Sequence, residues 1–330
     1  MPGFIDLHTH GAAGVDFIEA TVEDLQRVSQ FYASHGVTGF LATTWSASPD
    51  VIQRTLENVR AVMGHEKGSA LLGIHLEGPF INPARAGAQS PREIRAAQQE
   101  EVLPYLDSGL VKVISLAPEI QENQWLICAC QERGITTAAA HSDATYDEMR
   151  IAVELGLQHV THCFNAMRSF NHREPGVMGA ALEMEELSCE IIADKVHVHP
   201  AAIRLLLRAK QRNKVVLVTD SIAGTGTPDG IVEIQDKKIR YTKQDARLLD
   251  GTLAGSVLTM DGALRNLVEI SGEPVEKVWM CSSRNAAMVI RLDPSKGVIQ
   301  PEMDADLVLL DKDLHVVMTI VGGKIVYQRE

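Results

Sequence analysis

The chain has 330 residues, of which 45% are hydrophobic and 22% charged, and its formal net charge is −12. This composition excludes a collagen, a coiled coil, a disordered tail and a small disulfide scaffold. We find no run of about 18 apolar residues that would predict a transmembrane helix. Strong negative charge is a poor match for nucleic acid or an anionic membrane, so neither is an expected partner. The first residues, Met1–Asp6, lack the basic and apolar regions of a signal peptide, which predicts a cytoplasmic protein.

Short apolar or β-branched runs alternate with helix-period stretches along the first two thirds of the chain. The predicted strands are Gly3–His8, Val37–Thr44, Ala70–Glu77, Val111–Ala117, Ile135–His141, His159–Phe164, Cys189–Ala193 and Val215–Thr219. Eight strands with seven connecting segments predict an α/β fold, the (β/α)8 TIM barrel. A doubly wound open sheet is the competing architecture.

Helices are predicted between these strands. They cover Thr21–His35, Pro49–Met63, Pro91–Ser108, Tyr146–Leu155 and Pro200–Arg212. Ser48 before Pro49 and Ser90 before Pro91 have the pattern of an N-cap followed by a first-turn proline.

The last hundred residues change character. Ile231–Thr242 is predicted as a hairpin, and Thr259–Ser271 and Pro274–Val289 as helices. Three short strands follow at Asp306–Leu310, Val316–Val321 and Lys324–Gln328. We therefore expect a catalytic barrel over residues 1–300, with a hairpin insertion near 231–252, and the strands of a small β-sandwich over 301–330.

The five cysteines do not form a metal-binding pattern. Cys128 and Cys130 lie in a helix-like run, and no second pair complements them. Buried thiols in a reducing compartment are the favoured interpretation over a metal knuckle.

Histidines and carboxylates recur where the predicted strands end. His8 and His10 end the first strand and share one face of it, because side chains alternate along a strand. Four further strands end at Glu77, His141, His162 and Asp220. The carboxyl ends of barrel strands form the active-site face, so these groups are expected to converge. Imidazole and carboxylate ligands without thiols suit a catalytic divalent metal, with Zn²⁺ as first choice and Fe²⁺ as the alternative. Taken alone, a histidine at a strand end is more often a hydrogen-bonded structural residue than a metal ligand.

Several motifs carry a family resemblance that runs from residue 2 to the C-terminus. They are Pro2–Gly11 (PGFIDLHTHG), His75–Asn82 (HLEGPFIN), Thr161–Met167 (THCFNAM), His172–Gly176 (HREPG) and Leu253–Ser256 (LAGS). Together they make the chain similar to the N-acetylglucosamine-6-phosphate deacetylases of the amidohydrolase superfamily. The resemblance implies hydrolysis of the acetamide of N-acetyl-D-glucosamine 6-phosphate to D-glucosamine 6-phosphate and acetate. Such a reaction serves amino-sugar catabolism or cell-wall recycling.

The resemblance also implies roles for single residues. Glu77, His141 and His162 match the principal metal ligands, and His8 and His10 match a pair that holds a second metal in some members, so one or two divalent ions are expected. Metal-bound water would be the nucleophile and Asp220 the general base and acid. Substrate contacts are implied for Ala88, Gln89, Asn165, Ala166, Arg173, His197, Leu253, Ala254 and Gly255, with Arg173 and His197 toward the phosphate. A homodimer is implied, with a phosphate contact lent across its interface.

Three departures from the family pattern stand out. The family has a leading segment that supplies strands to the β-sandwich, whereas this chain starts at the first barrel strand, so an incomplete β-sandwich appendage is expected. Gln89 stands where a histidine is usual, and it can donate a hydrogen bond but cannot be charged. Lys195 stands where a glycine is common, and it either supports an anionic substrate or is merely solvated.

Other functions compete with the deacetylase. One is another amidohydrolase, such as a cyclic-amide hydrolase or an N-acyl amino acid deacylase. Many of these bridge two metals with a carboxylated lysine at the end of strand four, which here ends in Leu116–Glu119 without a lysine. A deacetylase for the galactosamine epimer and an inactive metal-binding scaffold are the remaining alternatives.

Overall fold

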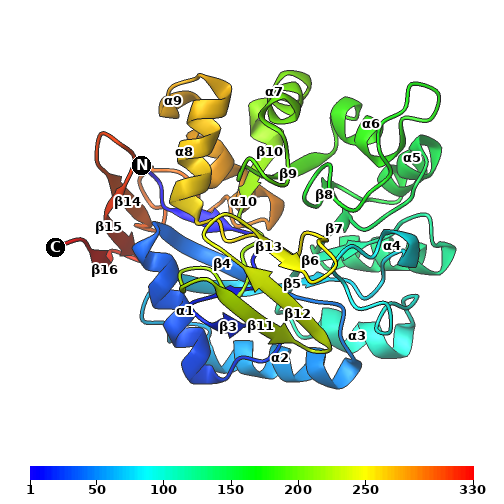
Figure 1. Cartoon of the computed structure of the whole chain (residues 1–330), viewed down its shortest axis with the longest axis horizontal. Coiled ribbons are helices and arrows are strands. Elements are labelled where there is room, and N and C mark those ends of the chain that lie inside the picture. The colour runs from blue at the N-terminus through cyan, green and yellow to red at the C-terminus, as the bar shows by residue number, and fades with distance from the viewer.

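The computed structural model describes residues 1–330, and its centre is a barrel of eight parallel strands (Figure 1). The strands pair in chain order, which confirms the barrel and rules out the doubly wound sheet. They are β1 (Phe4–Asp6), β4 (Val37–Thr44), β5 (Ala70–Glu77), β6 (Val111–Leu116), β7 (Thr136–Ala139), β8 (His159–Val160), β9 (Ser188–Ile192) and β10 (Val215–Val218).

Side-chain and loop contacts bring the first and last strands together. Just beyond the two strands, the amide of Asp220 donates to the carbonyl of His8 at 2.8 Å. The hydroxyl of Thr219 donates to the carboxylate of Asp6 at 2.6 Å. These bonds hold the segments that follow β1 and β10 side by side.

Helices surround the barrel (Figure 1), and most of the predicted ones lie within a few residues of their expected ranges. They are α1 (Val22–Ser34), α2 (Pro49–Val62), α3 (Gln99–Asp107), α4 (Gln124–Glu132), α5 (Tyr146–Glu154), α6 (Gly176–Glu183), α7 (Pro200–Ala209), α8 (Met260–Ser271), α9 (Val275–Val278) and α10 (Arg284–Val289). A capping box between Thr21 and Asp24 fixes the start of α1. None of the helices combines the length and apolar character needed to span a bilayer.

Two helix predictions are wrong at their boundaries. No helix begins at Pro91, because Arg95 holds the preceding segment in an irregular path through bonds to the carbonyls of Glu93 and Ala47. The predicted helix Pro274–Val289 is split into α9, a 3₁₀ turn and α10. The hydroxyls of Ser282 and Ser283 both donate to the carbonyl of Trp279 and so compete with the helical backbone bonds.

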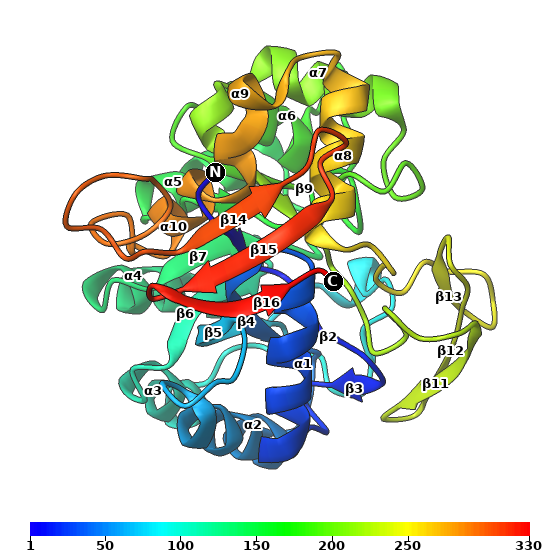
Figure 2. The same cartoon turned by 90° about the vertical axis from the view of Figure 1, so that its left-hand side faces the viewer.

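Small antiparallel sheets complete the fold, and the predicted hairpin and tail strands are present. One sheet contains β11 (Gly230–Ile234), β12 (Lys237–Tyr241) and β13 (Ala246–Leu248), and a short pair is β2 (Gly11–Ala12) with β3 (Val15–Asp16). The tail forms β14 (Leu307–Leu310), β15 (Val316–Val321) and β16 (Lys324–Gln328), beside the N-terminus and α1 (Figure 2). The amide of Gly3 bonds to the carbonyl of Asp306 at 2.9 Å. The domain division at residue 300 stays a prediction.

The apolar core has two main parts. One fills the barrel interior below the strand ends, with Leu7, Leu41 and Val113 among its buried members. The larger part lies between the strands and the surrounding helices. All five cysteines are free, and four are buried, but Cys128 is exposed on α4, so its prediction as a buried thiol is wrong. The side chain of Cys128 lies on the solvent face of its helix, whereas Cys130 packs in the core.

Candidate metal centre and active site

The chain turns sharply after three barrel strands, and the turning residues carry the site's side chains. His141, His162 and Asp220 have positive φ angles of 46°, 28° and 51°. Left-handed backbone at a non-glycine residue costs on the order of 1–3 kcal/mol and persists only where the surroundings impose it. Here it directs three polar side chains toward the same space.

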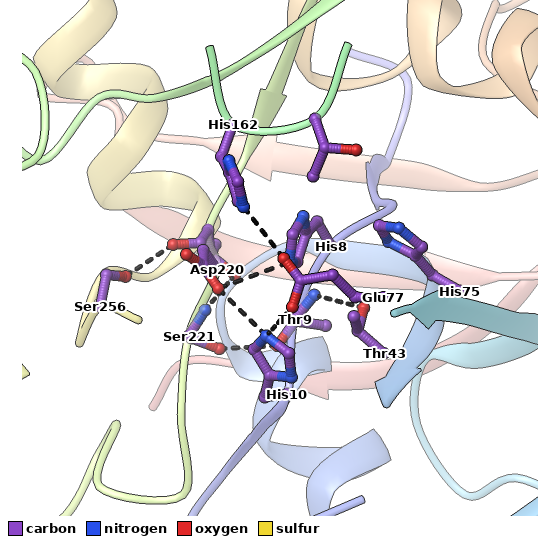
Figure 3. Close-up of polar contacts among 12 residues, drawn as sticks. His8, Thr9, His10, Thr43, His75, Glu77, His162, Asp220, Ser221 and Ser256 are labelled. Atoms are coloured by element: carbon purple, nitrogen blue, oxygen red, sulfur yellow. Dashed lines mark hydrogen bonds and ion pairs between the residues drawn. The ribbon is translucent and has the colours of Figure 1, made fainter. Parts of the chain in front are cut away.

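Glu77 lies at the middle of the predicted ligands (Figure 3). Its Oε1 atom lies 3.0 Å from Nε2 of His162 and 3.2 Å from Nε2 of His141. The two imidazole nitrogens are 3.2 Å from one another. Two nitrogens that face each other and a carboxylate oxygen form a donor set that a cation can bind.

His8 and His10 approach the same carboxylate from the end of β1 (Figure 3). Nε2 of His10 lies 3.3 Å from Oε2 of Glu77 and 3.3 Å from Oδ1 of Asp220. Nε2 of His8 lies 3.5 Å from a carboxylate oxygen of each of these two residues. This nitrogen is buried and has no hydrogen-bond partner. A second donor set therefore lies beside the first.

The charges of the centre favour a divalent cation. Burial lowers the pKa of His8, but the carboxylates of Glu77, Asp220 and Glu190 outweigh burial and raise it to about 10. Burial also opposes the charged form of His10, while hydrogen bonds to Asp220 and Glu77 raise its pKa to about 9. The carboxylates thus favour protonation of both His8 and His10. A divalent ion would supply the same positive charge in place of these two protons. Imidazole and carboxylate donors fit Zn²⁺ or Fe²⁺.

Neighbouring side chains hold the centre in place. The amide group of Gln89 donates to Oε2 of Glu77 at 2.5 Å and accepts from the backbone of Ser46 at 2.7 Å. The indole of Trp45 stacks on His10, with ring centroids 3.9 Å apart, and donates to Asp16 at 2.8 Å. Gln89 is thereby bonded to Glu77, a predicted metal ligand, in addition to lining the cavity.

A cavity opens above the ligands. Its lining includes Glu77, His141, His162, His10 and Asp220, together with the predicted contacts Ala88, Gln89, Asn165, Ala166, His197, Leu253 and Gly255. Trp45, Gly87 and Thr252 complete the lining, and no lysine belongs to it. Gly87 has a left-handed φ of 56°, which favours glycine, and a Cβ there would approach the ring of His141 tightly, at 3.3 Å.

His197 is fixed at the cavity wall by a carboxylate. Its Nδ1 donates to Asp194 at 2.6 Å, and the backbone amides of Val196 and His197 bond to the same side chain. Burial opposes a charged imidazole, but Asp194 raises the pKa of His197 above its ordinary value. An imidazole with this partner is suited to an anionic group.

Four residues that the sequence analysis singled out do not line the cavity. His8 is fully buried behind the cavity, within reach of Glu77 and Asp220. Ala254 is also buried, and its backbone amide bonds to the carbonyl of Ala246. Arg173 is exposed and does not line the cavity. Lys195 pairs with Glu269 at 2.7 Å, so its charge is already matched within the chain.

Sequence reasoning missed Glu190 and Trp45. Glu190 is fully buried on β9 and bonds to His8, His159 and the backbone of His162. The available signal was a lone carboxylate inside the apolar strand Ser188–Ile192. A buried carboxylate is costly unless it is paired, so this position required a partner.

A barrel whose strand ends carry a buried histidine–carboxylate centre below an open cavity defines the class of metal-dependent barrel hydrolases. The chain belongs to the amidohydrolase family, whose model matches residues 1–326.

Individual relatives cover nearly the whole chain. The N-acetylglucosamine-6-phosphate deacetylase of Bacillus subtilis (strain 168) is 38% identical over 99% of this chain and 84% of its own length. The N-acetylgalactosamine-6-phosphate deacetylase of Escherichia coli O157:H7 is 34% identical over 98% of this chain and 86% of its own. The crystal structure of N-acetylglucosamine-6-phosphate deacetylase from Thermotoga maritima superposes with a TM-score of 0.93 at 37% identity, covering 100% of this chain and 89% of that one.

Proposed function

We propose that this chain hydrolyses the acetamide of N-acetyl-D-glucosamine 6-phosphate, giving D-glucosamine 6-phosphate and acetate in amino-sugar catabolism or cell-wall recycling. The observation that carries the proposal is the position of Asp220, whose carboxylate lines the cavity next to the histidine–glutamate centre. Relatives that carry this activity in their names align over the full chain and support the choice of substrate.

Glu77, His141 and His162 would hold the principal ion, and His8 and His10 a second one, with Zn²⁺ preferred over Fe²⁺. When bound, a divalent metal polarises the substrate carbonyl and lowers the pKa of water. Residue types and mutual distances support this assignment, because two imidazole nitrogens and one carboxylate oxygen meet within 3.2 Å.

Asp220 would act first as a general base and then as a general acid. Burial alone would raise the pKa of Asp220, but positive charge on His8 and a hydrogen bond from His10 lower it below its ordinary value. The carboxylate is therefore ionised at neutral pH and can accept a proton from the attacking water. Delivery of that proton to the amine nitrogen completes cleavage, because a neutral amine is a better leaving group than an amide anion.

Binding groups around the cavity would orient the sugar. His197, held by Asp194, is the proposed phosphate contact within the chain. Arg173 is exposed on the same loop as Phe170, whose side chain is 59% exposed. An exposed aromatic beside an arginine is typical of interface residues, which supports a homodimer in which Arg173 of one subunit serves the cavity of the other.

N-acetyl-D-galactosamine 6-phosphate is the second candidate substrate, because a relative at 34% identity is named for it. The test is acetate release by the metal-reconstituted chain from both phosphorylated epimers and from unphosphorylated N-acetylglucosamine. Rapid turnover of the phosphorylated glucosamine substrate is expected. Faster turnover of the galactosamine epimer would reassign the substrate. No acetate from any of the three, with a folded and metal-loaded sample, would overturn the proposed deacetylase.

A further inference from the structure

We infer that Glu190 is a positioning residue of the metal centre, which orients His8 for metal binding and ties it to the strand end that carries His162. This inference rests on the proposed metal-dependent function. It concerns a residue on β9 that touches ligands but does not line the cavity.

Glu190 has three hydrogen-bond donors around its fully buried carboxylate. Oε2 accepts from Nδ1 of His8 at 3.0 Å and from the backbone amide of His162 at 3.1 Å. Oε1 accepts from Nε2 of His159 at 3.1 Å. A buried carboxylate is tolerated when its lone pairs are satisfied in this way. Two of the three donors belong to residues of the metal centre.

The contact with Glu190 decides which nitrogen of His8 is free. An ionised carboxylate only accepts hydrogen bonds, so Nδ1 of His8 must carry a proton. The lone pair available for a metal is then on Nε2, the atom that is buried without a partner between Glu77 and Asp220. A histidine ligand whose second nitrogen donates to a carboxylate is held in one tautomer and one ring orientation.

Glu190 could instead be a ligand itself, because His8, His75 and Glu190 also lie close enough to hold an ion. The bonds of His75 oppose this alternative. Its Nδ1 lies 3.1 Å from the carbonyl of Leu7, and its Nε2 lies 2.7 Å from the hydroxyl of Ser115. Both nitrogens are therefore occupied, and Nδ1 of His8 cannot bind a metal while it donates to Glu190.

The second bond of Glu190 reaches the principal ligand set. His162 has a φ of 28°, and its amide is held by the carboxylate of Glu190. This bond restrains a strained backbone, whereas the bond to His8 restrains a ligand ring directly. Loss of Glu190 should therefore weaken the ion at His8 and His10 more than the ion at His141 and His162.

The experiment counts metal ions and measures their affinities in the full-length chain. Wild type, Glu190→Gln and Asp261→Asn are equilibrated with Zn²⁺ buffered by a chelator, and bound zinc is measured by elemental analysis. Asp261→Asn is the matched control, because Asp261 is also a buried carboxylate that accepts from a histidine Nδ1 at 3.0 Å, but it does not line the cavity. We expect the weaker site of Glu190→Gln to lose 10- to 100-fold in affinity. The control should keep both wild-type affinities.

A second variant separates positioning from general damage. In a His8→Gln background, Glu190→Gln should not lower the number of bound ions further, since its effect on the second ion passes through His8. If Glu190→Gln does not fold, Glu190→Asp carries the same expectation, because its shorter side chain keeps the charge but cannot span the distance to Nδ1.

Four outcomes would overturn the inference: one ion per wild-type chain, wild-type affinity in the Glu190 variants, equal loss in Asp261→Asn, or a further loss of ions in the double variant. Acetate release is measured separately. A chain that binds two ions but hydrolyses none of the three sugars would refute the proposed function while leaving the role of Glu190 supported.

Discussion

Replacing Asp220 by asparagine tests the centre of the proposed reaction. The substitution preserves the size of the side chain and removes only its charge and its ability to accept a proton. Oδ1 of Asp220 lies 3.3 Å from Nε2 of His10 and 3.5 Å from Nε2 of His8. The backbone amide of Asp220 donates to the carbonyl of His8, and its carbonyl accepts from the amide of Ser256. The fold around it is therefore expected to stay intact.

The expected loss in kcat follows from the role of the carboxylate. General acid–base catalysis contributes about 10²- to 10⁴-fold, which corresponds to roughly 3–5 kcal/mol of activation free energy. The principal ion should remain bound, because Glu77, His141 and His162 are unchanged. KM should change much less than kcat, since proton transfer is made only in the transition state.

Asp261→Asn is the control for the loss of a buried aspartate. Both residues are 7% exposed, and Asp261 bonds to His35 at 3.0 Å and Arg265 at 2.8 Å, away from the cavity lining. This variant should lose stability and keep its kcat. Acetate release, bound metal and thermal unfolding are measured for both proteins. If metal-loaded Asp220→Asn kept a kcat within tenfold of wild type, the base and acid role would be refuted.

Three further predictions concern stability and ligand support. Gly255 has a φ of 65°, and the new Cβ of Gly255→Ala would lie 2.8 Å from the carbonyl oxygen of Asp220. We expect the free energy of unfolding, measured in urea, to fall by about 1–3 kcal/mol and kcat to fall as well. Unchanged values would contradict this prediction. Gln89→Leu removes the hydrogen-bond donor to Glu77 and should weaken metal binding about 10- to 100-fold, as measured by competition with a chelator. A metal affinity equal to that of the wild type would contradict this prediction. Burial alone would raise the pKa of Asp261, but its histidine and arginine partners bring it well below its ordinary value. Its stabilisation is therefore present above about pH 4 and lost as the pH falls further, so the free-energy difference between wild type and Asp261→Asn should shrink between pH 7 and pH 3.

The barrel strands were predictable because their burial is nearly continuous. β4 and β5 are buried along almost their whole length, and both occupy the predicted ranges. The absence of a helix between Pro91 and Gln98 was not predictable, because the guanidinium of Arg95 binds carbonyls that lie far apart in sequence. Local propensity carries no information about such contacts.

Convergence of the site was predictable for a geometric reason. Parallel strands of a barrel end at one rim, so His10, Glu77, His141 and Asp220 meet once the strands are correct. Details within the rim were not predictable. The sequence indicates a substrate contact at Gln89, but the direction of its amide depends on Ser46 and on Glu77, which only the folded chain brings together.

The bonds that hold the strained strand ends explain how the centre can be formed before any ligand binds. The amide of Asn82 bonds to the carbonyl of His141, and the amide of Ser256 to the carbonyl of Asp220. The amide of His162 bonds to Glu190. Each left-handed residue of the centre is therefore restrained by a neighbouring segment. Since ligand geometry is set by the protein, binding of the ion does not have to provide the free energy of bending the backbone, and that free energy remains available for holding the ion.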